Sequence, residues 1–190
     1  MIRDPEQRGE RLAQFHRAVA PRLWQDLLDS GVLPFAEPGE RDRQREEWDD
    51  LCLHACVRGL VMAGGFGEDS SVAIDALHRT VLEARMRGDA IEPFEAARAR
   101  LAERYAEYGD IARRLDGAPG LAEAIGDAAG RHLVEAPSDE LAQLVGGLYE
   151  VMTEGAAEAV RQGEPAAPVD GGGAAHDRAS HDPRRGEAPA

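Results

Sequence analysis

Two cysteines in one short segment are the first candidates for chemistry in this chain. Cys52 and Cys56 stand four positions apart, so a helix places both thiols on one face. His54 lies between them in sequence and would point to the opposite side, so the three residues do not form a local metal site. A disulfide between helical positions i and i+4 would be strained. The simplest interpretation is two reduced, buried thiols that pack as small apolar side chains.

Three histidines fall on apolar helical stripes rather than on polar faces. They are His16, His78 and His132. If the fold gathers them with Cys52 and Cys56, the five side chains could hold zinc, iron or haem. The alternative is that each is an interior histidine with its own hydrogen-bond partner. The sequence alone leaves both possibilities open.

Catalytic motifs are absent from the sequence. The chain contains no lysine, and all 22 of its basic residues are arginine. This excludes a P-loop lysine and a Schiff-base lysine. The chain also has no Gly-x-Ser-x-Gly or His-Glu-x-x-His pattern. We therefore predict a binding protein rather than an enzyme, and we assign no catalytic residues and, in the first instance, no cofactor.

Composition and charge narrow the class of protein further. The 190 residues suit a single domain, and the lack of lysine and asparagine is typical of a GC-rich bacterial genome. A net charge of −14 without a basic stripe argues against direct binding to nucleic acid. No stretch is long and apolar enough for a membrane span, and the charged start MIRDPEQRGE is unlike a secretory signal. We expect a cytoplasmic protein.

The hydrophobic pattern predicts helices throughout and no strand. Apolar residues recur at helical spacing, and glycine and proline separate the segments. Pro21 predicts a kink in the first segment, or its division into two shorter helices. The expected helices are 5–30, 40–63, 70–87, 93–116, 120–134 and 138–162. The fold class is therefore all-α, with a single bundle of about six helices over 1–162 and an acidic surface.

The remaining segment, 163–190, has a different composition. It consists mostly of Gly, Pro, Ala and scattered charges, and Val169 is its only large apolar residue. Such a segment buries too little apolar surface to offset the entropy of ordering it. We predict a disordered, low-complexity tail.

The last predicted helix is the candidate interaction surface. Its apolar row is Leu141, Leu144, Leu148, Val151 and Met152. Small residues at Gly146, Gly147 and Gly155 would allow another backbone to approach closely. Alternatively, the same row faces the protein's own core.

The helical pattern, the acidic charge and the lack of catalytic motifs favour a helical module that recognises a protein partner or a second copy of itself. A metal- or haem-binding helical sensor and an enzyme with a dispersed site are the alternatives.

Overall fold

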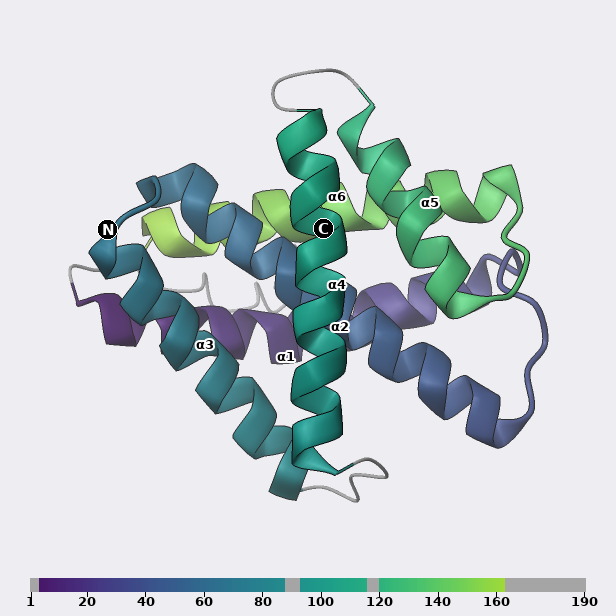
Figure 1. Ribbon diagram of the computed structural model, residues 1–190, viewed down its shortest axis with the longest axis horizontal. Helices are drawn as coiled ribbons and strands as arrows, with labels where there is room; N and C mark the ends of the chain where they lie inside the picture. Colours follow the sequence, from purple (N-terminus) through teal and green to yellow (C-terminus); the bar gives the residue numbers. More distant parts are fainter. Residues whose placement is uncertain (1–3, 88–92, 116–119, 163–190) are drawn as a thin grey trace, which may run out of the picture.

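The computed structural model describes residues 4–87, 93–115 and 120–162, and these ranges form six α-helices without any strand. This confirms the expected all-α bundle (Figure 1). The predicted tail 163–190 lies outside the described residues. The helices are α1 (Pro5–Asp29), α2 (Pro38–Gly64), α3 (Glu68–Arg87), α4 (Phe94–Arg114), α5 (Leu121–Leu133) and α6 (Asp139–Gln162).

Pro21 does not divide the first helix, so the predicted alternative of two shorter helices was wrong. The proline lies inside α1 on its exposed face, where its missing N–H costs one backbone hydrogen bond. Buried residues before and after it, Leu12 and Leu27 among them, hold both halves of the helix against the same core. In addition, Trp48 of α2 donates a hydrogen bond from Nε1 to the carbonyl of Ala20, at 3.1 Å. Packing of both halves against the core therefore outweighs the tendency of Pro21 to interrupt the helix.

Helix α2 is the centre of the bundle and contacts each of the other five helices. Figure 1 shows it running diagonally behind α4. Its residues from Asp50 to Cys56 are all buried, as expected of a helix whose apolar residues lie on every side. The helix ends at Gly64, and Gly65 follows with φ of 75°, a conformation that glycine adopts without strain.

Glycines bring three pairs of helices into close contact. A Cβ atom added at Gly59 of α2 would lie 2.4 Å from the carbonyl oxygen of Thr153 in α6. Likewise, Gly9 packs α1 against α3, and both Gly126 and Gly146 pack α5 against α6. Gly146 therefore serves the chain's own packing and not a partner. Gly147 has nothing near its hypothetical Cβ.

Buried carboxylates on α2 hold α3 and α4 in place. Asp50 is fully buried and accepts hydrogen bonds from Arg85 of α3 at 2.8 Å and from Arg100 of α4 at 2.9 Å. One turn earlier, Glu47 accepts two hydrogen bonds from Arg104, at 2.7 and 2.9 Å. These paired charges tie α4 across the front of the bundle, where Figure 1 shows it crossing the other helices.

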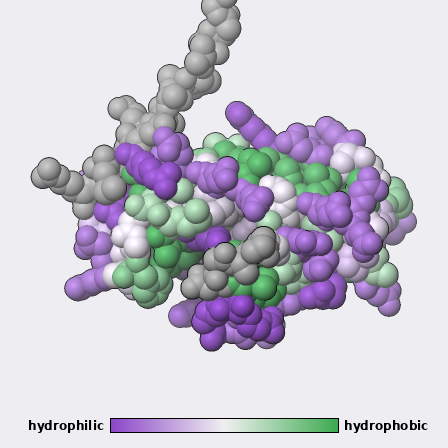
Figure 2. Space-filling view, turned by 90° about the horizontal axis from the view of Figure 1, so that it is seen from above, coloured by the Kyte–Doolittle hydropathy of each residue, from purple (hydrophilic) through white to green (hydrophobic). Residues whose placement is uncertain are grey.

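The surface of the bundle carries both hydrophobic and hydrophilic side chains (Figure 2). Within the described ranges, the helices include none that is long and apolar enough to cross a membrane. On the face shown in Figure 2, hydrophobic residues form a band bordered by hydrophilic side chains. The most exposed large hydrophobic residues of the described chain are Phe35, Met62, Phe66, Val72, Met86, Phe94 and Val151.

Candidate functional site

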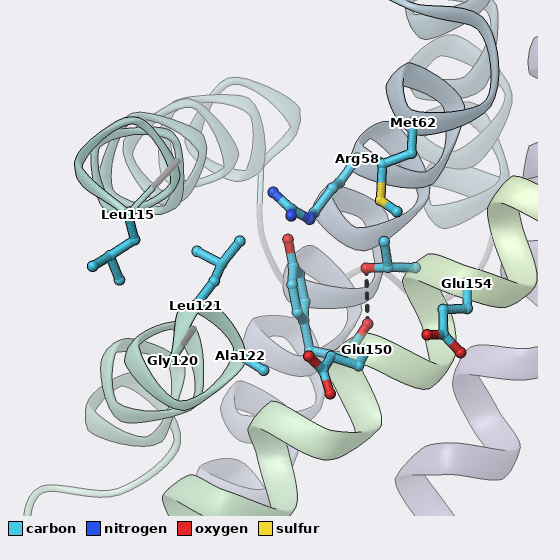
Figure 3. Close-up of a pocket in the computed structure, with 10 residues that line it drawn as sticks. Arg58, Met62, Leu115, Gly120, Leu121, Ala122, Glu150 and Glu154 are labelled. Carbon is cyan, nitrogen blue, oxygen red and sulfur yellow. Dashed lines mark hydrogen bonds between the residues drawn. The ribbon is translucent and has the colours of Figure 1, made fainter. Parts of the chain in front are cut away.

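A cavity of about 290 Å³ lies between α2, α5 and α6, beside the end of α4. This is close to the lower limit of volume for small-molecule sites, about 300 Å³. Its walls carry apolar side chains, one arginine, one phenol and two carboxylates (Figure 3). The lining residues are Arg58, Met62, Leu115, Gly120, Leu121, Ala122, Tyr149, Glu150, Thr153 and Glu154.

Arg58 is the cation of this cavity. It is half-buried on α2, two residues beyond the all-buried segment that ends at Cys56. Figure 3 shows its guanidinium extending from α2 toward Leu121 and away from Glu154. It forms no hydrogen bond or ion pair with any residue in the described ranges. A half-buried guanidinium has five N–H donors, so this one is available to an anionic ligand.

Tyr149 connects the cavity to a buried histidine. Its hydroxyl lies 3.2 Å from Nδ1 of His54, and the two rings are stacked at 5.9 Å between centroids. The rings of Tyr105 and Tyr108 lie at 5.1 and 5.2 Å from the same imidazole. Burial, with a smaller contribution from the positive charge of Arg58, lowers the pKa of His54 to about 4. The imidazole is therefore neutral at pH 7.

The phenols near His54 stay protonated. Burial raises the pKa of Tyr149, Tyr105 and Tyr108 above the ordinary value for a tyrosine. A protonated phenol can donate one hydrogen bond and accept another, but it is a poor nucleophile at neutral pH. The hydroxyl of Thr153 already donates to the carbonyl oxygen of Tyr149, at 2.9 Å. The lining of the cavity thus offers groups that bind rather than groups that attack.

Negative charge marks one side of the cavity. Glu150 and Glu154 are exposed residues of α6, one turn apart. Met62, Leu115 and Leu121 supply the apolar wall. A ligand in this cavity therefore meets a cation at Arg58, apolar surface in the middle and two carboxylates near solvent.

The predicted cysteine and histidine residues do not come together as a metal site. Both thiols are buried, and burial raises the pKa of Cys52 and Cys56. Within the described ranges, His, Cys, Asp and Glu side chains form no group of three that could hold a metal ion. The three histidines have separate partners: the carbonyl oxygen of Asp49 for His16, the Tyr105 hydroxyl for His78, and Glu107 for His132.

The predicted interaction residues of α6 divide into three groups by exposure. Leu141 and Met152 are buried in the core, whereas Leu144 and Leu148 are half-buried and pack against it. Val151 is 55% exposed and faces solvent. Only one edge of the predicted row is therefore available to a partner.

Sequence reasoning did not single out Arg58, Tyr149 or Thr153. The available signal was Arg58 itself, a charge between Cys56 and Leu60 in the apolar part of α2. A charge in such a segment usually faces a partner or a cavity. Tyr149 and Thr153 carried no signal, because either residue is ordinary at a helix boundary.

Comparisons with known proteins add no assignment. No family model matches the chain, and the curated proteins and the solved structures give no match either.

Proposed function

We propose that this protein is a non-catalytic helical binding module whose ligand is a small amphipathic carboxylate. The observation that carries the proposal is the half-buried guanidinium of Arg58, which has no partner among the described residues and lines a cavity with apolar walls. A carboxylate would pair with Arg58 through two parallel hydrogen bonds. Its hydrocarbon part would cover Met62, Leu115 and Leu121, which gains the free energy of burying apolar surface.

The phenol and the two glutamates refine this ligand class. With Nδ1 of His54 donating to its oxygen, the Tyr149 hydroxyl can donate its own proton to a carboxylate oxygen bound at Arg58. Glu150 and Glu154 would repel a second negative charge near solvent, so the outer end of the ligand should be neutral or positive. Dicarboxylates are therefore disfavoured, whereas short monocarboxylates and amino-terminated carboxylates fit.

Calorimetric titration with hexanoate tests the proposal. Hexanoate carries the carboxylate and the apolar chain, whereas hexylamine, of the same length, carries the opposite charge. We expect saturable binding of hexanoate at a ratio of one to one and no binding of hexylamine. Arg58→Gln should weaken hexanoate binding by roughly tenfold, the effect of losing one charge-assisted hydrogen bond.

Two further variants make this test specific. Arg22 is exposed on α1 and does not line the cavity, so Arg22→Gln changes the net charge equally and should leave hexanoate binding unchanged. Glu154→Gln removes a repulsive charge and should strengthen hexanoate binding by about twofold to threefold at low salt. Binding of hexylamine in place of hexanoate, or equal losses in the two arginine variants, would show that the ligand class is wrong.

A second candidate function is recognition of a basic amphipathic helix by α6. The exposed side chain of Val151 and the half-buried Leu144 and Leu148 form an apolar edge. Glu150 and Glu154 flank this edge and would attract positive charge on the partner. This keeps the protein-interaction hypothesis but limits it to the residues that the chain's own core leaves accessible.

A further inference from the structure

A second cavity, of about 230 Å³, lies where α1, α2 and α3 meet, and it shares no residue with the first. Its lining is positively charged, although the protein as a whole carries a net charge of −14. Arg17, Arg45 and Arg85 contribute three guanidinium groups, and Asp49 contributes the one carboxylate. His16 also lines the cavity, and the remaining residues are Ala20, Pro21, Val81 and Ala84.

The three guanidinium groups are only partly used within the described chain. Arg85 donates from Nη1 to Asp50, but its Nη2 is buried without a hydrogen-bond partner. Arg45 lies 3.5 Å from Asp49 through Nε, an ion pair without a hydrogen bond, and its guanidinium stacks over Trp24. Arg17 is exposed and forms no ion pair with the described residues. Donors from three helices therefore remain at one cavity.

His16 adds a buried polar atom that also lacks a partner. The side chain is only 5% exposed, and its Nε2 lies 3.3 Å from the carbonyl oxygen of Asp49. A carbonyl oxygen only accepts hydrogen bonds, so Nε2 must carry the proton. Burial lowers the pKa of His16, which keeps the ring neutral and leaves Nδ1 as an unpaired acceptor. A ligand that suits this atom must itself donate a hydrogen bond.

Several buried side-chain nitrogen atoms without a hydrogen-bond partner belong to residues that line this second cavity. Arg85 Nη2, Arg45 Nε and His16 Nδ1 are three of the buried side-chain atoms without a hydrogen-bond partner, and all three belong to residues that line this one cavity. Native proteins seldom leave such atoms unsatisfied, so their gathering in one place indicates a ligand. The cavity is smaller than sites for drug-sized molecules, which exceed about 300 Å³, and so it suits a small ion.

We propose that this cavity binds a phosphate dianion, which accepts hydrogen bonds from Arg17, Arg45 and Arg85 and donates its own P–OH hydrogen bond to Nδ1 of His16. Arg45 is paired with Asp49 and Arg85 with Asp50, so the charge of Arg17 remains uncompensated, while N–H donors of all three guanidinium groups remain for an anion. Planar guanidinium groups from three directions match the tetrahedral oxygens of phosphate. Sulfate has the same shape and charge but no proton to donate, and acetate has only one charge.

Calorimetry at about pH 7.5 with inorganic phosphate tests this site. We expect saturable binding at a ratio of one to one, with weaker binding of sulfate and of acetate. Arg17→Gln removes an exposed donor that holds no other part of the fold, so the variant should fold as the wild type does by circular dichroism. Its affinity for phosphate should fall by about fivefold, as expected for one partly screened charge.

Arg22→Gln is the matched control, because it removes the same charge from the same helix outside the cavity. It should change phosphate affinity by less than about twofold. If the two cavities bind independently, each variant affects only its own ligand. Arg58→Gln should therefore leave phosphate binding unchanged, and Arg17→Gln should leave hexanoate binding unchanged. The proposal is overturned by absence of saturable phosphate binding, by sulfate or acetate binding as tightly, or by equal losses in Arg17→Gln and Arg22→Gln.

A parallel titration with glycerol 3-phosphate separates the free ion from a phosphate ester. At about pH 7.5 the ester is mostly a dianion that has no P–OH group, as sulfate has none, so we expect it to bind more weakly than inorganic phosphate. Weaker binding of the ester assigns the cavity to the free ion. Affinity for the ester equal to or higher than that for inorganic phosphate would overturn the proposed hydrogen bond to Nδ1 of His16.

Discussion

The hydroxyl of Tyr149 lies 3.2 Å from Nδ1 of His54, and this contact joins a surface cavity to a buried imidazole. Arg58 acts on the same pair, because it lines the cavity and its positive charge contributes to the low pKa of His54. An anion bound at Arg58 would cancel part of that charge. The pKa of His54 would then rise, so ligand binding and protonation of the core are coupled.

Protonation of His54 should destabilise the protein in acid. Its pKa is about 4 in the folded protein, below the value of 6.5 for an unperturbed histidine. As pH falls from about 6.5 toward 4, the unfolded state therefore binds the proton first, and stability is lost through this range. The loss attributable to His54 at pH 4 is on the order of 2–3 kcal/mol.

Urea unfolding at several pH values measures this loss. The pKa values of His16 and His78 are also lowered, so the wild type alone does not isolate one residue. His54→Gln should show a shallower decline in unfolding free energy between about pH 6.5 and 4 than the wild type. If the two curves run parallel, His54 is not the titrating group.

Asp50 should be among the most sensitive residues of the fold. It is fully buried and accepts hydrogen bonds from arginines of two other helices. Asp50→Ala leaves two guanidinium groups without their buried counter-charge, which typically costs about 3–5 kcal/mol. Glu6→Ala is the matched control, because its ion pair with Arg79 is exposed and should contribute less than about 1 kcal/mol. Chemical denaturation of both variants checks the contrast, and similar losses would contradict it.

The contact between α2 and α6 depends on glycine at position 59. In Gly59→Ala, the new Cβ would lie 2.4 Å from the carbonyl oxygen of Thr153, so the helices must separate. Overpacking of this kind costs roughly 1–3 kcal/mol. Gly147→Ala has open space and should instead stabilise α6 by about 0.5–1 kcal/mol through higher helix propensity. Thermal unfolding that moves the same way in both variants would refute this assignment.

The two cysteine thiols should be unreactive in the folded protein. Cys52 and Cys56 are buried and free, and burial raises the pKa of each, so the reactive thiolate is scarce at neutral pH. A chromogenic disulfide reagent should therefore label two thiols in guanidinium chloride and almost none in the folded chain over the same time. Rapid labelling without denaturant would show that this part of α2 opens readily.

The helices were predictable because their signals are local. Apolar spacing and helix-ending glycines predicted all six elements, and the missed continuity at Pro21 came from packing on both sides of it. The site was less predictable, because its residues come from separate helices and acquire their roles only through burial. Nothing near Asp50 in sequence shows that Arg85 and Arg100 will reach it. The charge of Arg58 within an apolar segment indicates a partner or a cavity, but it does not show which other helices supply the walls.

The last helix divides into core and surface positions, and glutamate substitutions can separate them. Leu141 is 1% exposed, so Leu141→Glu buries a charge without a partner and should unfold the chain. Val151 is 55% exposed, so Val151→Glu should keep the circular dichroism spectrum and change stability by no more than about 0.5 kcal/mol.

If α6 recognises a basic helix, the folded Val151→Glu variant should bind a synthetic leucine- and arginine-rich amphipathic peptide more weakly than the wild type, despite its additional negative charge. Fluorescence anisotropy of the labelled peptide measures this. Equal or tighter binding by Val151→Glu would mean that charge alone attracts the peptide and that the apolar edge of α6 is not a recognition surface.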